Sequence, residues 1–348
     1  MAEVVATGRG VELSKRIERA RGVQTVLADL EPTALAATRD AALACQPFAG
    51  RGNKEAADAA ATEAMRRALA HAPGIGTIVI GEGEKDEAPM LFNGERLGAG
   101  GPDFDIAVDP LECTTLCAKG LPGSLATIAF AEAGALMRPG PSFYMDKLVV
   151  SSAAREVIDI TDPPEANLGR IAGALGKDVG ELCVVVLDKP RHTELIAALH
   201  RLGVSVSTPS DGDVAGALEA LLPELGADVL MGVGGTPEGV MTACAASAVG
   251  AGMQARLAPQ EETESSALAE AGLDPGRVYE LEDLVDGEAF FVATGVTGGS
   301  LLERPTERAG EPITDSIVVS RQCVKYLPAR NGGDQAGQTQ AKATQEVG

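Results

Sequence analysis

The second half of this 348-residue chain repeats one pattern three times. Each unit has an apolar run, then a polar or glycine-rich loop, then a segment with apolar residues at helical spacing; the units are CVVVLDKPRHTELIAALHRLG (183–203), VSVSTPSDGDVAGALEALLPELG (204–226) and DVLMGVGGTPEGVMTACAASAVG (228–250). Such alternation predicts an α/β fold in which parallel strands are packed against helices. Ligands of open parallel sheets bind beyond the carboxyl ends of the strands. We therefore expect the loops 188–192, 210–213 and 232–239 to share one rim.

Composition excludes several classes of protein. The formal net charge is −21, aromatic residues make up 3% and tryptophan is absent, which disfavours a nucleic-acid partner. The sequence shows neither a signal-peptide run nor an uncharged apolar stretch long enough to span a membrane. Its six cysteines are scattered without CxxC pairs, which predicts free thiols in a reducing compartment. We expect a cytoplasmic protein.

The first half predicts two helices and two buried strands. Helical spacing covers residues 11–44 and 55–70, and short apolar runs at 77–80 and 104–108 predict strands. Each strand leads into acidic residues: GEGEKDE (81–87) follows the first, and DPLECTT (109–115) follows the second. Carboxylates gathered at strand ends suit Mg²⁺ or Mn²⁺, although Glu84 and Glu87 fit an acidic surface loop equally well. We expect Pro110 to fix a turn, and a helix to begin near Thr114.

Three loops of the second half suggest a phosphorylated ligand. Lys189-Pro190-Arg191 places two cations around a rigid proline, which suits a phosphate, although an exposed pair at a strand end is the plain alternative. Asp211-Gly212-Asp213 could accept hydrogen bonds from sugar hydroxyls or simply cap a helix. Residues 232–239 lack a clean G-x-G-x-x-G, so metal-assisted phosphate binding explains that loop better than a dinucleotide does. We expect His192 to support the site, not to act as a base.

Seven segments read together resemble class II fructose-1,6-bisphosphatase, the GlpX-type family. The segments, in chain order, are GRGNKEAAD (50–58), IGEGEKDEAPM (80–90), DPLECTT (109–115), YMDKL (144–148), DKPRH (188–192), DGD (211–213) and GVGGTPEGV (232–240). That family belongs with the inositol monophosphatases to the lithium-sensitive, metal-dependent phosphatases. The resemblance implies a layered α-β-α-β-α sandwich. It also suggests an N-terminal helical extension (1–49), a metal-binding domain (50–182), a substrate-binding domain (183–330) and a disordered tail (331–348).

The resemblance also implies a role for individual residues. Two or more Mg²⁺ or Mn²⁺ ions would bind at one site, the first held by Asp58 and Glu82 and the second by Asp109, Glu112 and Glu238. Thr114 and Asp86 would orient the attacking water as catalytic residues. The positions that match substrate contacts are Lys54, Thr114, Tyr144, Lys189, Arg191, Asp211, Asp213 and Gly235.

The expected reaction is removal of the 1-phosphate from a sugar bisphosphate by in-line attack of water, without a phosphoenzyme. Fructose 1,6-bisphosphate is the leading substrate, followed by sedoheptulose 1,7-bisphosphate. Cys113 stands where the family usually has glycine, which leaves open a specialised sugar or cyclitol phosphate, or a non-catalytic regulator that binds phosphosugars. By the same resemblance we expect a homodimer or homotetramer.

Overall fold

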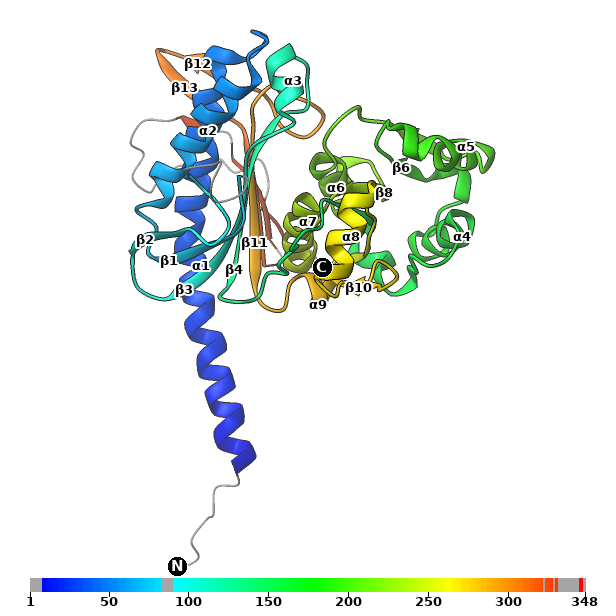
Figure 1. Cartoon of the computed structure of the whole chain (residues 1–348), viewed down its shortest axis with the longest axis horizontal. Coiled ribbons are helices and arrows are strands. Elements are labelled where there is room, and N and C mark those ends of the chain that lie inside the picture. Colours follow the sequence, from blue (N-terminus) through cyan, green and yellow to red (C-terminus); the bar gives the residue numbers. More distant parts are fainter. Residues whose placement is uncertain (1–7, 83–89, 322, 328, 331–343, 347–348) are drawn as a thin grey trace, which may run out of the picture.

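The computed structural model describes residues 8–82, 90–321, 323–327, 329–330 and 344–346, with side chains for 27–82, 90–321 and 323–327. These residues form five layers (Figure 1). Helices α1 and α2 cover the outer face of an eight-stranded sheet, and α6 and α7 lie between this sheet and a six-stranded one. Helices α4 and α5 cover the outer face of the second sheet. The expected α-β-α-β-α sandwich is confirmed.

The chain builds one side of the eight-stranded sheet, then the whole six-stranded sheet, and then returns to the first sheet. The eight-stranded sheet, in the order β17-β15-β14-β11-β4-β3-β1-β2, contains β1 (Gly74–Ile80), β2 (Arg96–Gly100), β3 (Asp103–Glu112), β4 (Leu125–Glu132), β11 (Ala289–Gly295), β14 (Ser316–Ser320), β15 (Cys323–Tyr326) and β17 (Thr344–Glu346). The six-stranded sheet, in the order β10-β9-β5-β8-β6-β7, contains β5 (Tyr144–Val150), β6 (Cys183–Val185), β7 (Ser205–Ser207), β8 (Val229–Gly235), β9 (Gly252–Leu257) and β10 (Tyr279–Glu280). A small third sheet joins β12 (Thr306–Arg308), β13 (Glu311–Thr314) and β16 (Ala329–Arg330).

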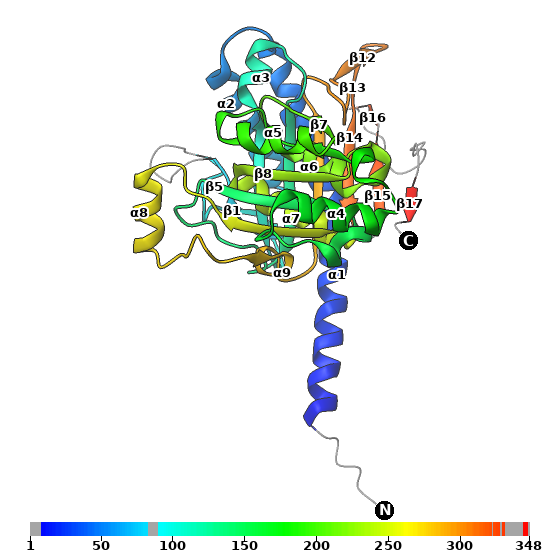
Figure 2. The same cartoon turned by 90° about the vertical axis from the view of Figure 1, so that its right-hand side faces the viewer.

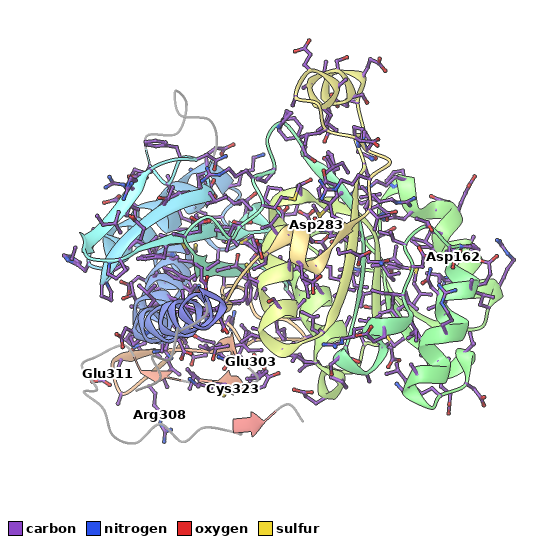
Figure 3. All side chains as sticks on the ribbon, turned by 90° about the horizontal axis from the view of Figure 1, so that it is seen from below. Asp162, Asp283, Glu303, Arg308, Glu311 and Cys323 are labelled. Atoms are coloured by element: carbon purple, nitrogen blue, oxygen red, sulfur yellow. The ribbon has the colours of Figure 1, made fainter. Side chains whose placement is uncertain are left out.

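The helices connect and cover these sheets. They are α1 (Gly8–Cys45), α2 (Lys54–Leu69), α3 (Thr114–Lys119), α4 (Pro164–Leu175), α5 (Thr193–Arg201), α6 (Val214–Leu221), α7 (Thr236–Val249), α8 (Glu262–Glu270) and α9 (Leu281–Leu284). Short 3₁₀ turns occupy Gln46–Phe48, Ser152–Val157, Val179–Glu181, Pro190–His192 and Pro223–Leu225. Helix α8 projects from the rest of the molecule (Figures 2 and 3), beside the loop that leads into β5. Among the residues described here, no helix is both long and apolar enough to cross a membrane.

Side-chain alternation explains how one strand serves two cores. On β4, Ile128 and Phe130 join the core beneath α1 and α2. Ala129 and Ala131, which point the opposite way, join the core that contains α7. Because both faces of the sheet are covered, its central strands are nearly continuous apolar runs. Helix α7 lies between the two sheets and carries no charged residue after Glu238, as expected of a helix buried on all sides.

Several expected elements differ from the structure in detail. The expected turn at Pro110 is wrong, because β3 continues through a register shift to Glu112 and the chain turns at Cys113. Strands β8, β6 and β7 are parallel as expected, whereas β5 and β9 pair antiparallel to their neighbours. The division at residue 182 stays a prediction, although β5 lies in the six-stranded sheet and β11, β14 and β15 return to the eight-stranded one. The tail predicted to be disordered lies outside the described residues except for 344–346, which pair with β15.

Candidate active site

Three carboxylates from two elements meet at the bottom of a cleft. Asp109 and Glu112 lie at the end of β3, and Glu238 lies in the first turn of α7. One oxygen from each lies within 4.8 Å of the others. Among the described residues, Glu112 Oε1 and Glu238 Oε2 are buried and have no hydrogen-bond partner. Buried polar atoms normally have partners, so this arrangement fits a divalent cation as the missing one.

The electrostatics of the cluster lead to the same conclusion. Burial raises the pKa of Glu238 to about 7, and the negative charges of Asp213 and Asp109 add to this effect. Burial followed by the charges of Asp109 and Glu238 raises the pKa of Glu112 well above its ordinary value. Burial also raises the pKa of Asp109. Without a cation the cluster would therefore hold protons near neutral pH, and a bound cation would displace them.

Two further carboxylates face the same cluster from other elements. Asp58 lies on α2, and burial together with the charge of Asp109 raises its pKa to about 6. Glu82 follows β1, and its backbone N–H donates to the Leu91 carbonyl at 2.9 Å. Burial, then the charges of Asp109 and Asp58, raise the pKa of Glu82 to about 8. The structure thus brings the other four predicted metal ligands within electrostatic reach of Asp109.

The turn after β3 depends on an unusual backbone conformation. Cys113 has φ 63° and ψ 53°, in the left-handed region that favours glycine. The Cys113 carbonyl accepts hydrogen bonds from the Leu116 N–H at 2.9 Å and from the Ser124 hydroxyl at 2.9 Å, which fix the turn. Half-buried Thr114 then begins α3 and lines the cleft. The Cys113 Sγ packs on Gly212, where a Cβ would lie only 2.1 Å from the sulfur.

The cleft is a cavity of about 690 Å³ between the end of β3 and the rim of the six-stranded sheet. The three loops expected to share one rim all line it, which confirms that expectation. Its lining includes Glu112, Cys113, Thr114, Tyr144, Lys189, Arg191, Asp211, Asp213, Gly235 and Glu238. The cavity therefore combines the carboxylates of Glu112 and Glu238 with two cations and two further carboxylates on its rim.

The two rim cations are held differently. Lys189 Nζ pairs with Asp211 Oδ1 at 3.1 Å, and both side chains are partly exposed, so this pair is weak and an arriving anion can displace it. Arg191 donates from Nε and Nη2 to the Val233 carbonyl at 3.1 and 2.8 Å. Its guanidinium also lies 5.2 Å from the centre of the Tyr144 ring. Arg191 is thus the fixed cation and Lys189 the adaptable one.

Comparison with known proteins shows the family of the chain. The family model of the bacterial, glpX-encoded fructose-1,6-bisphosphatase matches residues 28–330. The chain belongs to this family. It is 42% identical over 297 residues to the fructose-1,6-bisphosphatase class 2 of Haemophilus influenzae, which covers 81% of this chain and 89% of the relative. It is 40% identical over 297 residues to fructose-1,6-bisphosphatase 1 class 2 of Escherichia coli K12, covering 81% and 88%.

Several positions that match the family pattern do not line the cavity. Asp58, Glu82 and Asp109 are not among its lining residues. Lys54 is exposed at the first residue of α2 and does not line the cavity. Asp86 lies outside the described residues, as do Glu84 and Glu87. His192 is buried, with Nδ1 2.8 Å from the Leu187 carbonyl and Nε2 accepting from the Val233 N–H at 2.8 Å. Because both ring nitrogens bind backbone, His192 supports the rim and cannot act as a base.

Sequence reasoning missed two buried charged residues beside the cavity. Glu264 on α8 accepts hydrogen bonds from the backbone N–H groups of Phe143 at 2.7 Å and Tyr144 at 3.0 Å, so it holds the mouth of the cavity. No sequence pattern marks it in an acidic helix. Lys147 is buried on β5. The lysine within the mostly apolar strand YMDKLVV could have indicated this residue. A lysine is almost never buried without a partner, so its presence there predicts a buried carboxylate beside it.

Proposed function

We propose that this protein is a metal-dependent phosphoric monoester hydrolase. It removes the 1-phosphate of fructose 1,6-bisphosphate, so that water and the bisphosphate yield fructose 6-phosphate and inorganic phosphate. The observation that carries this proposal is the pair of orphaned carboxylate oxygens of Glu112 and Glu238 facing a cavity with Lys189 and Arg191 on its rim. The two relatives at about 40% identity carry the name of that activity.

The residues present fit two divalent ions, Mg²⁺ or Mn²⁺. Asp109, Glu112 and Glu238 would hold one ion, and Asp58 and Glu82 would hold the other. Hard carboxylate oxygens suit both metals, and the raised pKa values of the cluster leave room for a compensating charge. When bound, such ions make water more acidic and neutralise charge on the phosphate.

The other residues bind and orient the reactants. Thr114 at the start of α3 would hold the attacking water through its hydroxyl, with the help of Asp86, in line with the departing sugar oxygen. Lys189 and Arg191 would bind the phosphate that does not react. Asp211 and Asp213 would accept hydrogen bonds from sugar hydroxyls. Tyr144 and Gly235 would line the sugar site, and Lys54 would reach a phosphate.

Two alternatives remain, and Cys113 favours both. Its side chain crowds Gly212 inside the cavity, which would suit a specialised sugar or cyclitol phosphate. Cys113 could also belong to a regulator that binds phosphosugars without turnover. Sedoheptulose 1,7-bisphosphate is the second candidate independently of Cys113. The retained carboxylates favour the enzyme. We further propose that the protein is cytoplasmic and forms a homodimer or homotetramer.

The test is phosphate release from a panel of sugar monophosphates and bisphosphates with Mg²⁺, Mn²⁺ or excess EDTA. We expect release from fructose 1,6-bisphosphate that EDTA abolishes and added metal restores. Full activity in EDTA would overturn the metal assignment. Thermal stabilisation by the sugar phosphates without any release would instead favour the regulator.

A further inference from the structure

A buried lysine lies directly behind the sugar-binding side of the cavity. Lys147 is 1% exposed and, within the described part of the chain, is the only lysine or arginine in the buried class. It lies on β5, where Met145 and Val149, which point the same way, belong to the core around α7. Its Nζ forms an ion pair with Asp213 Oδ2 and donates to the Gly235 carbonyl at 2.9 Å. One ammonium group therefore joins two loops of the rim.

Two glycines leave the space for this arrangement. A Cβ at Gly234 would lie 1.9 Å from Asp213 Oδ2 and 2.9 Å from Lys147 Nζ. A Cβ at Gly239 would lie 3.3 Å from Lys147 Cδ. Any side chain at Gly234 would thus displace the ion pair. The glycines of the stretch GVGGTPEG therefore have a structural role in addition to phosphate binding, because they leave room for the Lys147 side chain between β8 and α7.

Lys147 acts on the cavity only through its neighbours. Asp213, Gly234, Gly235 and Glu238 line the cavity, whereas Lys147 does not. Asp213 is 4% exposed, and a buried carboxylate is costly without a close positive partner, so the ion pair with Lys147 fixes the position of this side chain.

We propose that Lys147 is a positioning residue of the active site, which holds Asp213 aimed into the cavity and fixes the Gly235 carbonyl behind it. The proposal rests on the proposed function, because it takes Asp213 as a sugar-binding residue. The orientation of this carboxylate determines how well its oxygens accept hydrogen bonds from a polyhydroxy substrate. Lys147 itself touches no reacting atom.

The experiment is a double-mutant cycle with Lys147→Met, Asp213→Asn and the double variant, measured as kcat and KM for fructose 1,6-bisphosphate. We expect each single change to raise KM by about tenfold to a hundredfold, the size of one lost hydrogen bond to a charged group, with kcat within about threefold of wild type. The double variant should be no worse than the worse single one, because both changes act through the same carboxylate. Unchanged KM values, or effects that multiply, would overturn the proposal.

Folding failure does not leave the proposal undecided. If Lys147→Met alone does not fold, the double variant supplies the KM value. It removes both charges together, which destabilises a protein less than leaving one buried charge without its partner. Lys177→Met is the matched control. It breaks the Lys177–Asp228 pair at 2.5 Å, far from the residues that line the cavity, and should leave KM unchanged.

A readout independent of turnover separates this proposal from the proposed function. Thermal stabilisation by fructose 1,6-bisphosphate in EDTA should be lost in Lys147→Met and retained in Lys177→Met. A wild-type protein without phosphatase activity would overturn the function, but this comparison would still test Lys147. Equal stabilisation in both variants would show that Lys147 is only a core ion pair.

Discussion

Replacing Glu238 by glutamine should stabilise the metal-free protein while weakening its stabilisation by metal. In the absence of a cation, burial and nearby carboxylates raise the pKa of Glu238 from 4.5 to about 7. A carboxyl group with a raised pKa in the folded state contributes full stability below the unfolded value and loses it as pH rises through the folded one. Near about pH 8 that loss is complete, and at about 1.4 kcal/mol per unit it amounts to about 3 kcal/mol.

Glutamine keeps the shape of Glu238 and removes this cost. Its amide can also donate to Asp109 or Glu112, whose oxygens lie within 4.8 Å. We expect a gain of about 2–3 kcal/mol near about pH 8. The gain falls below about 1 kcal/mol near about pH 5, because Glu238 is then largely protonated in the folded state and the pH lies only slightly above its unfolded pKa of 4.5. An unfolding entropy of about 2.1 cal/mol/K per residue converts the gain at the higher pH into a rise in Tm of about 3–4 °C for a chain of this length.

The assay is thermal unfolding followed by circular dichroism in EDTA and with saturating MnCl₂, at both pH values. Mn²⁺ should stabilise wild type strongly and Glu238→Gln weakly, because the variant lacks one ligand. Glu270→Gln, exposed at the end of α8, is the control and should change stability by less than about 0.5 kcal/mol. A Glu238→Gln variant that is less stable than wild type in EDTA at the higher pH would refute the electrostatic reasoning.

Three other changes test separate parts of the site. Glu112→Gln should lower kcat by about a hundredfold or more without loss of Tm, as expected for a metal ligand, and near-normal turnover would exclude it from the metal site. Lys189→Ala should raise KM for the bisphosphate by about tenfold but not for a sugar monophosphate; an equal rise for both would contradict its role at the second phosphate. Cys113→Gly should change the free energy of unfolding by less than about 1 kcal/mol. Glycine relieves the strain of the left-handed backbone, but it also raises the conformational entropy of the unfolded chain, and the two effects offset each other. Denaturant titration measures that change, and a loss above about 2 kcal/mol would show that the thiol packing dominates.

The parallel units and the shared rim could be predicted because they depend on local patterns, whereas the layered sandwich was expected only from the family resemblance. Apolar runs followed by glycine-rich loops and helical spacing indicate a parallel unit, and β8, β6 and β7 form one. The antiparallel pairing of β5 with β8 has no such signal. It joins residues 144–150 to residues 229–235, which are far apart in the sequence and separated by several other helices and strands. Pro110 predicted a turn from local geometry, but the hydrogen bonds of β3 continue through a bulge and move the turn to Cys113.

The candidate site divides in the same way. Asp109, Glu112 and Glu238 could be found because acidic residues at strand and helix ends are unusual next to buried runs. The neighbours of a residue in sequence do not show which distant residues it contacts. Neither the contact of Lys147 with Asp213 nor that of Glu264 with Phe143 could therefore be predicted. Those contacts join residues more than sixty positions apart, and the assembly of the six-stranded sheet brings them together.

The position of α7 has a consequence for how the chain is made. This helix has no polar face to present to water, yet the strands that cover one side of it, β11 and β14, emerge from the ribosome after it. Until about residue 320 has been synthesised, the apolar surface of α7 and of β4 stays open in the nascent chain. Closure then requires pairing between β4 and β11 over more than 150 residues of separation, which is slow by its topology. Protein made at high rate should therefore depend on chaperones, and truncation before β14 should yield aggregates, not a smaller enzyme.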